Sequence, residues 1–577
     1  MDVPVVGGDP VRDEVGAALT DVDIDVRSAT VDELAQAPVG VVAGVAGSET
    51  FEAANRHARS GETTWIAVEV GGVGGQPIDT VDASVSVFGP KTACFGCLRD
   101  RVRSTRESDT GGSKPSGSRR TVRLAGAIAG SECVRTLEQG TNAPFATVTE
   151  LPYTERVLLP VPGCACQADD RDRAIDRTDE SGLALDETVD AMDQAIDERI
   201  GLCKSIGEID SYPVPYYLAT LANTGAYSDA TAPTNAAGVD DDWNRAFAKA
   251  IGEGLERYCA GVYREEDFVV AAAETLDAVL EPTAIVSPDD TPAFDPSTDS
   301  RWVDGVDLST GKQTSLPADA VHFPQPGPGY VPQITTGLGL GSSTADALVA
   351  GLTEIVERDA TMLSWFSTAD PVELSVSDER FQTVVRRVES EGLAVTPLLV
   401  TQDVDVPVVS VAVHREDGDW PAFAVGSAAD LDATAAARSA LAEATQNWME
   451  LRSIGPDEAT DAGAWIGHYG SFPAAAREFL DTSETVDAAS VSPDPVPSGT
   501  EAVETLVERL TDAGLTPYAA RLTTRDVAAL GFEAVRVIVP TAQPLFTANP
   551  YFGERARTVP ETLGTEPRLD GPPHPYP

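Results

Sequence analysis

Residues 334–366 read ITTGLGLGSSTADALVAGLTEIVERDATMLSWF, a glycine-rich turn followed by a predicted amphipathic helix. At 100° per residue, Asp346 and Glu357 differ by about 20° around this helix, and Glu354 lies within about 80° of Asp346. Three carboxylates therefore share one face, with Arg358 beside them. Such carboxylates repel one another unless a cation lies between them, and Mg²⁺ prefers oxygen ligands and usually arrives with phosphates. The pattern predicts a Mg²⁺ and phosphate site, with a solvated acidic face as the alternative.

A second stretch, residues 243–260, repeats the pattern in the sequence WNRAFAKAIGEGLERYCA. Lys249, Glu253 and Glu256 fall on one stripe of the expected helix, and Arg257 follows. Both stretches thus contain Glu-x-x-Glu-Arg on an amphipathic helix. One such pattern is common by chance, but its repetition favours a binding site over two unrelated surface helices.

These two helices resemble the signature helices of the YcaO family. The stretch AARSALAEATQNW matches a third helix of that family through Arg438, Glu443 and Gln446. The segment NPYFGERARTVPETLG, residues 549–564, is similar to the family's late Phe-Gly-x-Arg segment. The resemblance extends over roughly residues 195–577.

The last residues, PPHPYP, fit the Pro-x-Pro-x-Pro pattern typical of peptide cyclodehydratases in this family, with prolines at 573, 575 and 577. The resemblance implies that the carboxylate of Pro577 lies near the site as a positioning group or base, and we take Pro577 as the candidate catalytic residue. A disordered polyproline tail is the alternative interpretation.

The resemblance also implies the ligands of ATP and Mg²⁺. The predicted residues are Lys249, Glu253, Glu256, Arg257, Ser342, Asp346, Glu354, Glu357, Arg358, Arg438, Glu443 and Gln446, with Lys204 and Ser205 from an early phosphate-binding segment. The carboxylates would hold Mg²⁺ or position ATP, and the guanidinium groups would contact phosphates, whose geometry they match.

The chemistry implied is ATP-dependent activation of a backbone amide in a ribosomally made peptide, as in bacteriocin biosynthesis. A Cys, Ser or Thr side chain attacks the preceding carbonyl, whose oxygen leaves as phosphate, giving a thiazoline or oxazoline. Thioamide formation with external sulfide is a second possibility. The third is a non-catalytic accessory factor, such as one serving a ribosomal-protein methylthiotransferase. It would rest on three departures from the family: Ser342 for Asn, Asp346 for Glu and Trp448 for Arg.

The composition is strongly acidic, with 92 acidic and 41 basic residues among 577 and a net charge of −51. The acidity is diffuse and only five of the basic residues are Lys. This is typical of the high-salt cytoplasm of a halophilic archaeon, where screening lengths fall to about 3 Å. Nucleic-acid binding is disfavoured. No bilayer-spanning run or signal peptide is visible, so we expect a cytoplasmic protein with no membrane partner.

Residues 1–90 alternate between strand and helix patterns, which predicts a parallel α/β sheet. The first turn, VVGGDPV, lacks a full Gly-x-Gly-x-x-Gly. We therefore expect a structural Rossmann-like layer rather than a nucleotide site. No Lys follows the glycines at 337–341 in the manner of a P-loop, and the five His form no metalloprotease motif.

Two cysteine pairs stand out: Cys94 and Cys97 at the start of a predicted helix, and Cys164 and Cys166 much later. Two such pairs are typical of a structural tetrathiolate zinc site, which supports folding rather than catalysis. Two pairs of reduced thiols are the alternative. We interpret the other three cysteines as lone thiols of the core or surface.

The sheet and cysteine pairs resemble the ThiF-like scaffold domain that partners YcaO domains in azole-forming enzymes, here in a truncated form. The predicted fold is α/β: a Rossmann-like domain with a four-cysteine zinc site over 1–170, a linker over 171–195, and a mixed α/β ATP-binding domain over 196–577. No winged-helix element is expected before the first strand, so the resemblance implies a separate peptide-recognition or dehydrogenase partner. A homodimer is expected by analogy.

Overall fold

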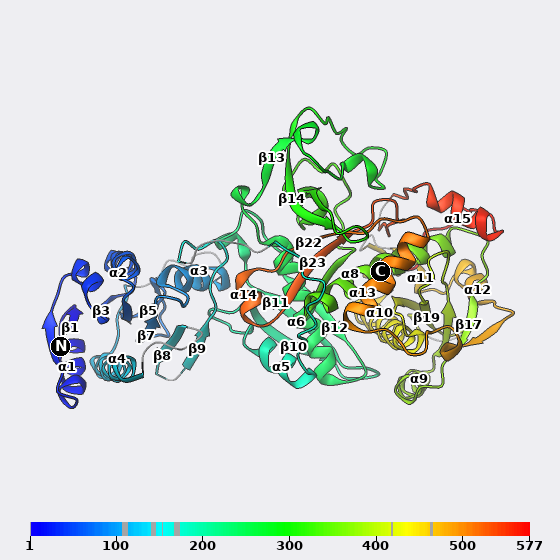
Figure 1. Cartoon of the computed structure of the whole chain (residues 1–577). Helices are drawn as coiled ribbons and strands as arrows, with labels where there is room; N and C mark the ends of the chain where they lie inside the picture. Colours follow the sequence, from blue (N-terminus) through cyan, green and yellow to red (C-terminus); the bar gives the residue numbers. More distant parts are fainter. Residues whose placement is uncertain are drawn as a thin grey trace.

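The computed structural model describes residues 2–106, 114–139, 146–152, 154–166, 173–416, 419–461, 465–547 and 549–577. Part of the segment between the two cysteine pairs and the predicted boundary at 170–171 lie outside these ranges. Figure 1 shows an N-terminal body at one end of an elongated molecule, a larger C-terminal body at the other, and a lobe around β13 and β14 that projects from the larger body.

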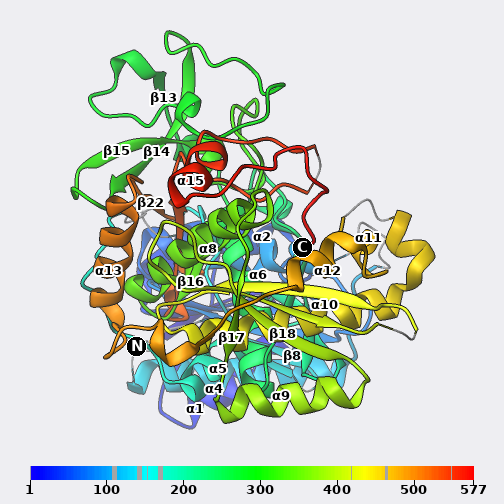
Figure 2. The ribbon, with the colours of Figure 1, turned by 90° about the vertical axis from the view of Figure 1, so that its right-hand side faces the viewer.

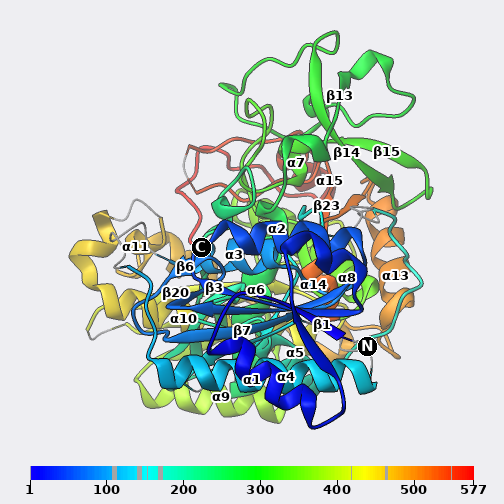
Figure 3. The ribbon, with the colours of Figure 1, turned by 90° about the vertical axis from the view of Figure 1, so that its left-hand side faces the viewer.

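The N-terminal body is a seven-stranded sheet of order β2-β1-β3-β4-β7-β8-β9. Its strands are β1 (Asp2–Val6), β2 (Asp25–Ser28), β3 (Val39–Val45), β4 (Thr64–Val70), β7 (Ala83–Phe88), β8 (Ala146–Leu151) and β9 (Thr154–Leu158), with a small hairpin of β5 (Gly72–Val73) and β6 (Gln76–Pro77). Its helices are α1 (Val11–Thr20), α2 (Glu49–Ser60), α3 (Phe95–Thr105) and α4 (Arg119–Gln139). Figure 3 shows α1 and α4 on one side of the sheet and α2 and α3 on the other.

The prediction of a Rossmann-like layer is confirmed, but the sheet is only partly parallel. Strands β1 to β4 pair in parallel, as their intervening helices require. The predicted strand at 83–88 pairs antiparallel with β4 instead. The connection between them holds only the short hairpin of β5 and β6, and a parallel pairing would need a longer crossover.

The second half is a mixed α/β structure built on three further sheets, of order β10-β11-β12, β13-β14-β22-β23-β16 and β20-β19-β18-β17-β21, with β15 beside β14. The strands are β10 (Cys203–Asp210), β11 (Tyr216–Leu221), β12 (Asn235–Val239), β13 (Val269–Ala272), β14 (Asp299–Asp307), β15 (Gln313–Pro317), β16 (Leu338–Gly341), β17 (Val372–Ser375), β18 (Ala394–Leu399), β19 (Val408–His414), β20 (Phe423–Ala429), β21 (Thr485–Asp487), β22 (Tyr518–Arg521) and β23 (Glu533–Ile538). The helices are α5 (Leu185–Asp193), α6 (Trp243–Gly261), α7 (Ala318–Val321), α8 (Thr344–Trp365), α9 (Glu379–Ser390), α10 (Ala433–Asp461), α11 (Trp465–Tyr469), α12 (Ala474–Leu480), α13 (Gly499–Asp512), α14 (Arg525–Ala529) and α15 (Arg555–Leu563).

The three helices predicted to carry the site each pack on a strand of these sheets. Helix α6 packs on β12, α8 on β16 and β23, and α10 on β19 and β20. Helix α8 also contacts β19 and β20, so it lies between two sheets, as Figure 2 shows. The predicted linker is not a bare connection, because its α5 packs on α6. Among the described residues, no helix is both long enough and apolar enough to span a membrane.

Glycines in the strands allow these helices to approach closely. A Cβ on Gly238 of β12 would lie 2.2 Å from the backbone nitrogen of Ala250 and 2.3 Å from the carbonyl oxygen of Ala246, both on α6. Gly339 of β16 and Gly426 of β20 meet the backbones of α8 and α10 in the same way, at 2.2 and 2.4 Å. The backbone-to-backbone contact fixes how deep each helix sits on its strand.

We expect Gly238→Ala to lower the free energy of unfolding of the second half by about 1–3 kcal/mol, because the added methyl group cannot fit against α6. The matched control is Gly207→Ala on β10 of the same sheet, where a Cβ meets no atom within 4 Å. Chemical denaturation monitored by tryptophan fluorescence would compare them. Equal denaturation midpoints for the two variants would contradict the packing argument.

Candidate active site

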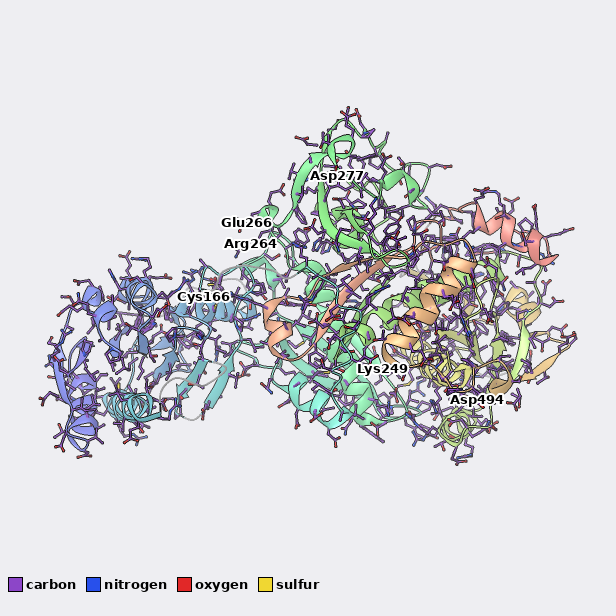
Figure 4. All side chains as sticks on the ribbon, viewed as in Figure 1. Cys166, Lys249, Arg264, Glu266, Asp277 and Asp494 are labelled. Carbon is purple, nitrogen blue, oxygen red and sulfur yellow. The ribbon has the colours of Figure 1, made fainter. Side chains whose placement is uncertain are left out.

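A cavity of about 1110 Å³ is lined by residues of α6, α8 and α10, the three predicted signature helices. The predicted residues that line it are Lys249, Glu253, Arg257, Glu354, Glu357, Arg358, Glu443, Gln446 and Pro577. Loop 332–336 and residues of β11 and β12 complete the wall. Figure 4 labels Lys249 on the C-terminal body, where its side chain is exposed.

One glutamate on each helix is held by a backbone N–H of the strand or turn on which that helix packs. The three hydrogen bonds run from Ala237 N to Glu253 Oε2 at 2.6 Å, from Gly337 N to Glu354 Oε2 at 2.9 Å, and from Ser427 N to Glu443 Oε2 at 2.6 Å. Each bond fixes one oxygen of its carboxylate and so sets the direction in which the side chain points. The carboxylates are therefore positioned before any cation binds.

Two arginines offset this negative charge. The Arg257 guanidinium pairs with Glu253 Oε1 at 2.5 Å. Arg358 is looser, with its Nε 3.7 Å from Glu357 Oε1 and 3.8 Å from Glu354 Oε1. Its Nη1 is buried and makes no hydrogen bond to any described residue. Arg358 therefore keeps donor capacity for an anionic ligand such as phosphate.

Burial and crowding change the acidity of the glutamates. Burial raises the pKa of Glu256, which adjoins the cavity lining, to about 8, with Glu354 and Glu253 adding to the shift. Burial also raises the pKa of Glu357 to about 8, with Glu443 adding to it and Arg358 opposing it. The pKa values of Glu253 and Glu443 are raised for the same first reason. The ligand-free site thus holds protons that a cation would displace.

The carboxylates suit Mg²⁺ bound together with a nucleotide. Among the described residues, no three of the glutamates converge closely enough to ligate a single ion by themselves. Mg²⁺ usually takes one or two protein carboxylates and completes its shell with water and phosphate oxygens. The separated, pre-positioned glutamates fit that mode rather than an all-protein metal cage.

Two predicted residues lie away from the cavity, at the N-terminus of α8. The Ser342 hydroxyl donates to Asp346 Oδ2 at 3.1 Å and accepts from Leu183 N at 3.0 Å. Ser342 and, through it, Asp346 are therefore tied to the segment before α5. Asp346 shares its angular position with Glu357, but eleven residues separate them by about 16 Å along the helix axis. A helical projection cannot show that separation.

Three other predicted residues are also placed outside the cavity lining. Arg438 pairs with Asp378 at 3.2 Å and lines a neighbouring pocket of about 190 Å³, which Lys249 also borders. Lys204 and Ser205 lie on β10, and Ser205 is exposed and pairs with Thr220 of β11. The structure does not bring these three to the glutamates.

Sequence reasoning missed several residues that shape the cavity. The Ser427 hydroxyl donates to Glu357 Oε1 at 2.7 Å, and the Tyr216 hydroxyl donates to Glu450 Oε1 at 2.8 Å. Arg536 of β23 donates to the carbonyls of Ile334 and Thr335 and so supports the loop that lines the cavity. Glu450 lies one turn after Gln446 and could have been found from that spacing. The others depend on contacts between residues far apart in the sequence.

The proline-rich segment is packed into the molecule, so the alternative of a disordered tail is wrong. His574 and Tyr576 are 1% and 2% exposed. The Tyr576 hydroxyl bonds to that of Ser410 at 2.9 Å, and Trp365 Nε1 donates to Pro572 O at 3.0 Å. These contacts bring Pro577 to the lining of the cavity.

The four predicted cysteines gather at one point of the N-terminal body. Their sulfur atoms all lie within 4.8 Å of one another, with Cys94 to Cys164 at 3.7 Å and Cys97 to Cys166 at 3.5 Å. Zinc–sulfur bonds of about 2.3 Å give a tetrahedron with edges of about 3.8 Å. The four residues therefore fit a four-coordinate metal ion such as Zn²⁺. The remaining three cysteines are buried singly, as expected.

Comparison with known proteins identifies the second half. The model of the YcaO family, described as ATP- and Mg²⁺-binding cyclodehydratases, matches residues 237–543, more than half of the chain. That range contains all three helices that line the cavity. An uncharacterized protein of Methanothermobacter thermautotrophicus is 27% identical over 328 residues, which cover 54% of this chain and 83% of that protein.

Two solved structures share the fold over nearly the whole chain. A heterocyclase in complex with substrate and cofactor superposes with a TM-score of 0.74 at 20% identity, covering 100% of this chain and 84% of that one. The heterocyclase TruD superposes with a TM-score of 0.67 at 19% identity, covering 98% and 82%. The fold of this chain, with both bodies, is therefore found in solved structures.

We expect Mg·ATP binding at pH 7 to release about two protons, because Glu256 and Glu357 have pKa values of about 8 without ligand and must ionise beside the cation. Isothermal titration calorimetry in buffers of different ionisation enthalpy measures this number. Release should vanish near pH 9.5, where both groups are already ionised. In the ligand-free protein the same shift lowers stability as the pH rises from about 4.5 to about 8.

Glu357→Gln should release about one proton fewer than the parent protein at pH 7. The exposed Glu379, which lies on α9 outside the cavity, provides the matched control through Glu379→Gln. Binding heats at pH 7 that do not depend on the buffer would contradict the assignment of protonated carboxyls to this cavity.

For the cysteine cluster, we expect about one Zn²⁺ per chain in the purified protein and its loss in Cys94→Ser, because three thiolates leave the tetrahedron open. The N-terminal body should then unfold at lower temperature. Cys133→Ala, which changes a buried cysteine outside the cluster, is the control and should keep its metal. Metal analysis by mass spectrometry gives the answer, and full zinc occupancy in Cys94→Ser would exclude the tetrathiolate assignment.

Proposed function

The chain belongs to the YcaO family, and we propose that it is a peptide cyclodehydratase that converts Cys, Ser or Thr residues of a ribosomally made peptide to thiazolines or oxazolines. The observation that carries the proposal is the cavity itself. Its glutamates come from three separate helices, and one glutamate on each helix is held by a backbone hydrogen bond. Arg257, Arg358 and Pro577 line the same cavity.

The charged residues of the site have two proposed roles, one for the glutamates and one for the arginines. Glu253, Glu256, Glu354, Glu357 and Glu443 would hold Mg²⁺ and position ATP. Bound Mg·ATP would supply the phosphoryl group that turns the amide oxygen into a leaving group, a change that amides need because they are poor electrophiles.

The arginines offset the charge that develops on the transferring group. Arg358 is suited to this role, because its Nε lies near Glu354 and Glu357 while its Nη1 makes no hydrogen bond to any described residue. Pro577 lies on the same wall and is the candidate to position the peptide. We further propose that Zn²⁺ fills the cysteine cluster, and that a separate protein recognises the peptide.

The residues that motivated the accessory-factor alternative have little bearing on the cavity. Ser342 and Asp346 are tied to the segment before α5 rather than to the glutamates. Trp448 is buried at 1% exposure, and its ring stacks under Arg452 at 4.4 Å. Departures at these three positions leave the glutamates and Arg358 in place, which supports an active enzyme.

We expect Glu354→Gln to lower peptide-dependent ATP hydrolysis at least about 100-fold, since it removes a charge from a pre-positioned site in a cavity. Phosphate release is the measurement, and Glu379→Gln should match the parent protein. Unchanged ATP hydrolysis in Glu354→Gln would show that this cavity is not the ATP site.

The reaction type is tested by co-expressing the protein with peptides encoded beside its gene and measuring the masses of the peptide products by mass spectrometry. Loss of one water at a Cys, Ser or Thr, absent with Glu354→Gln, is expected. Exchange of oxygen for sulfur would replace cyclodehydration by thioamide formation. An unmodified peptide from a sample that binds no Mg·ATP would favour the accessory factor.

A further inference from the structure

The cysteine cluster is contacted by a residue of the C-terminal body. Arg525, the first residue of α14, has its Nη2 3.4 Å from Cys166 Sγ and 3.9 Å from Cys97 Sγ, and it also donates to the carbonyl of Val161. Figure 4 shows Cys166 at the junction of the two bodies, close to Arg264. The cluster is thus part of the contact between the bodies, and not only an internal brace of the N-terminal one.

The charges explain why an arginine lies there. Four thiolates around a divalent cation carry a net charge of −2, and this cluster is mostly buried. The Nε and Nη1 of Arg525 are buried and make no hydrogen bond to any described residue. Its charge is therefore balanced mainly by the sulfur atoms, and the metal-loaded cluster and Arg525 stabilise each other.

The next residue along α14 makes a second contact with the same helix of the N-terminal body. Asp526 pairs with Arg101 of α3, and both side chains are fully buried. Arg101 lies one helical turn after Cys97 on α3, and Asp526 directly follows Arg525 on α14. Helix α3 thus presents a thiolate and a guanidinium, and α14 presents the complementary guanidinium and carboxylate.

This buried contact extends to a helix of the cavity. The Tyr258 hydroxyl donates to Asp526 Oδ2 at 2.5 Å, and Arg101 also donates to the Tyr258 oxygen at 3.3 Å. Tyr258 lies on α6, two residues after Glu256 and five after Glu253. Helix α14 therefore contacts the cysteine cluster through Arg525 and, through the adjacent Asp526, the helix that carries two of the site's carboxylates.

We propose that the metal centre acts on the ATP cavity through Arg525 and Asp526, which position α6, so that metal binding at the cysteines and Mg·ATP binding are coupled. Loss of the metal would let the four sulfur atoms separate, and the buried Arg525 would lose the sulfur contacts that its Nη2 makes. Because that is costly, α14 would shift and release its bond to Tyr258. Arg525, Asp526 and Tyr258 are positioning residues in this proposal, which rests on the proposed ATP site.

The test follows zinc transfer from the full chain to a coloured chelator, with and without Mg²⁺ and a non-hydrolysable ATP analogue. Because the coupling of binding free energies is reciprocal, the nucleotide should tighten zinc binding, which we expect to appear as zinc release slowed about fivefold or more in the parent protein. Arg525→Gln should release zinc about tenfold faster, because it removes a charged hydrogen bond to the sulfurs. Tyr258→Phe should keep the parent rate without nucleotide and lose the protection by nucleotide.

The matched control is Arg264→Gln. Arg264 also reaches across from the C-terminal body to the cysteine segment, where it donates to the Gly163 carbonyl at 2.7 Å, but no contact of it with sulfur is found among the described residues. It should release zinc like the parent protein. Equal acceleration in Arg264→Gln and Arg525→Gln would reduce the role of Arg525 to general interface packing and overturn the charge argument.

Calorimetry on the same samples separates this proposal from the proposed function. Nucleotide that binds the parent protein without changing zinc release would overturn the coupling and leave the ATP site intact. Protection that persists in Tyr258→Phe would overturn the assigned route. Nucleotide that fails to bind the zinc-loaded parent protein would overturn the ATP site and the coupling together.

Discussion

The active-site architecture depends on one repeated interaction, a backbone N–H that holds a glutamate on the helix packed against it. It occurs at Glu253, Glu354 and Glu443, on three different helices and with partners 16 or 17 residues earlier in the chain. The interaction requires helix and strand backbones to touch, which the glycines of β12, β16 and β20 permit. The spacing between donor and glutamate, the glycine in the strand and the position of the carboxylate therefore depend on one another. The same combination occurs three times around the cavity.

This arrangement concentrates negative charge on partly buried side chains, where water screens it only weakly. Two groups respond by holding protons, since burial raises the pKa of Glu256 and of Glu357 to about 8. Arg257 and Arg358 balance part of the remainder. The backbone bonds prevent the carboxylates from turning away, so the repulsion persists until a cation arrives. The site is thus pre-positioned for a metal–nucleotide complex at the cost of stability without it.

The fold class, the three helices and the cysteine cluster could be predicted from the sequence, because each depends on the spacing of residues within short stretches of the chain. Periodicity placed Glu354 and Glu357 on one face, and the cysteine pairs needed only their chemistry. It placed Asp346 in the site because angular position ignores axial rise. Ser427 and Arg536 could not be found, since they act through partners about 70 and 200 residues away. The antiparallel pairing of β7 was missed because the alternation of strands and helices over residues 1–90 suggested a parallel sheet throughout, although no helix separates β7 from β4.

The contacts between the two halves could not be predicted from local sequence patterns either. They give the N-terminal body a structural role in the second half. In sequence, a charged linker separates two segments that read as independent domains. In the structure, Arg101 and Asp526 are fully buried against each other, and Tyr227, Tyr258 and the Pro160 carbonyl satisfy further donors and acceptors. Separating the halves would expose these charges to water or leave one of them buried without its partner. A buried charge without a partner is strongly destabilising. The N-terminal body is therefore held to the C-terminal body by buried charges, and its cysteine cluster lies at that junction.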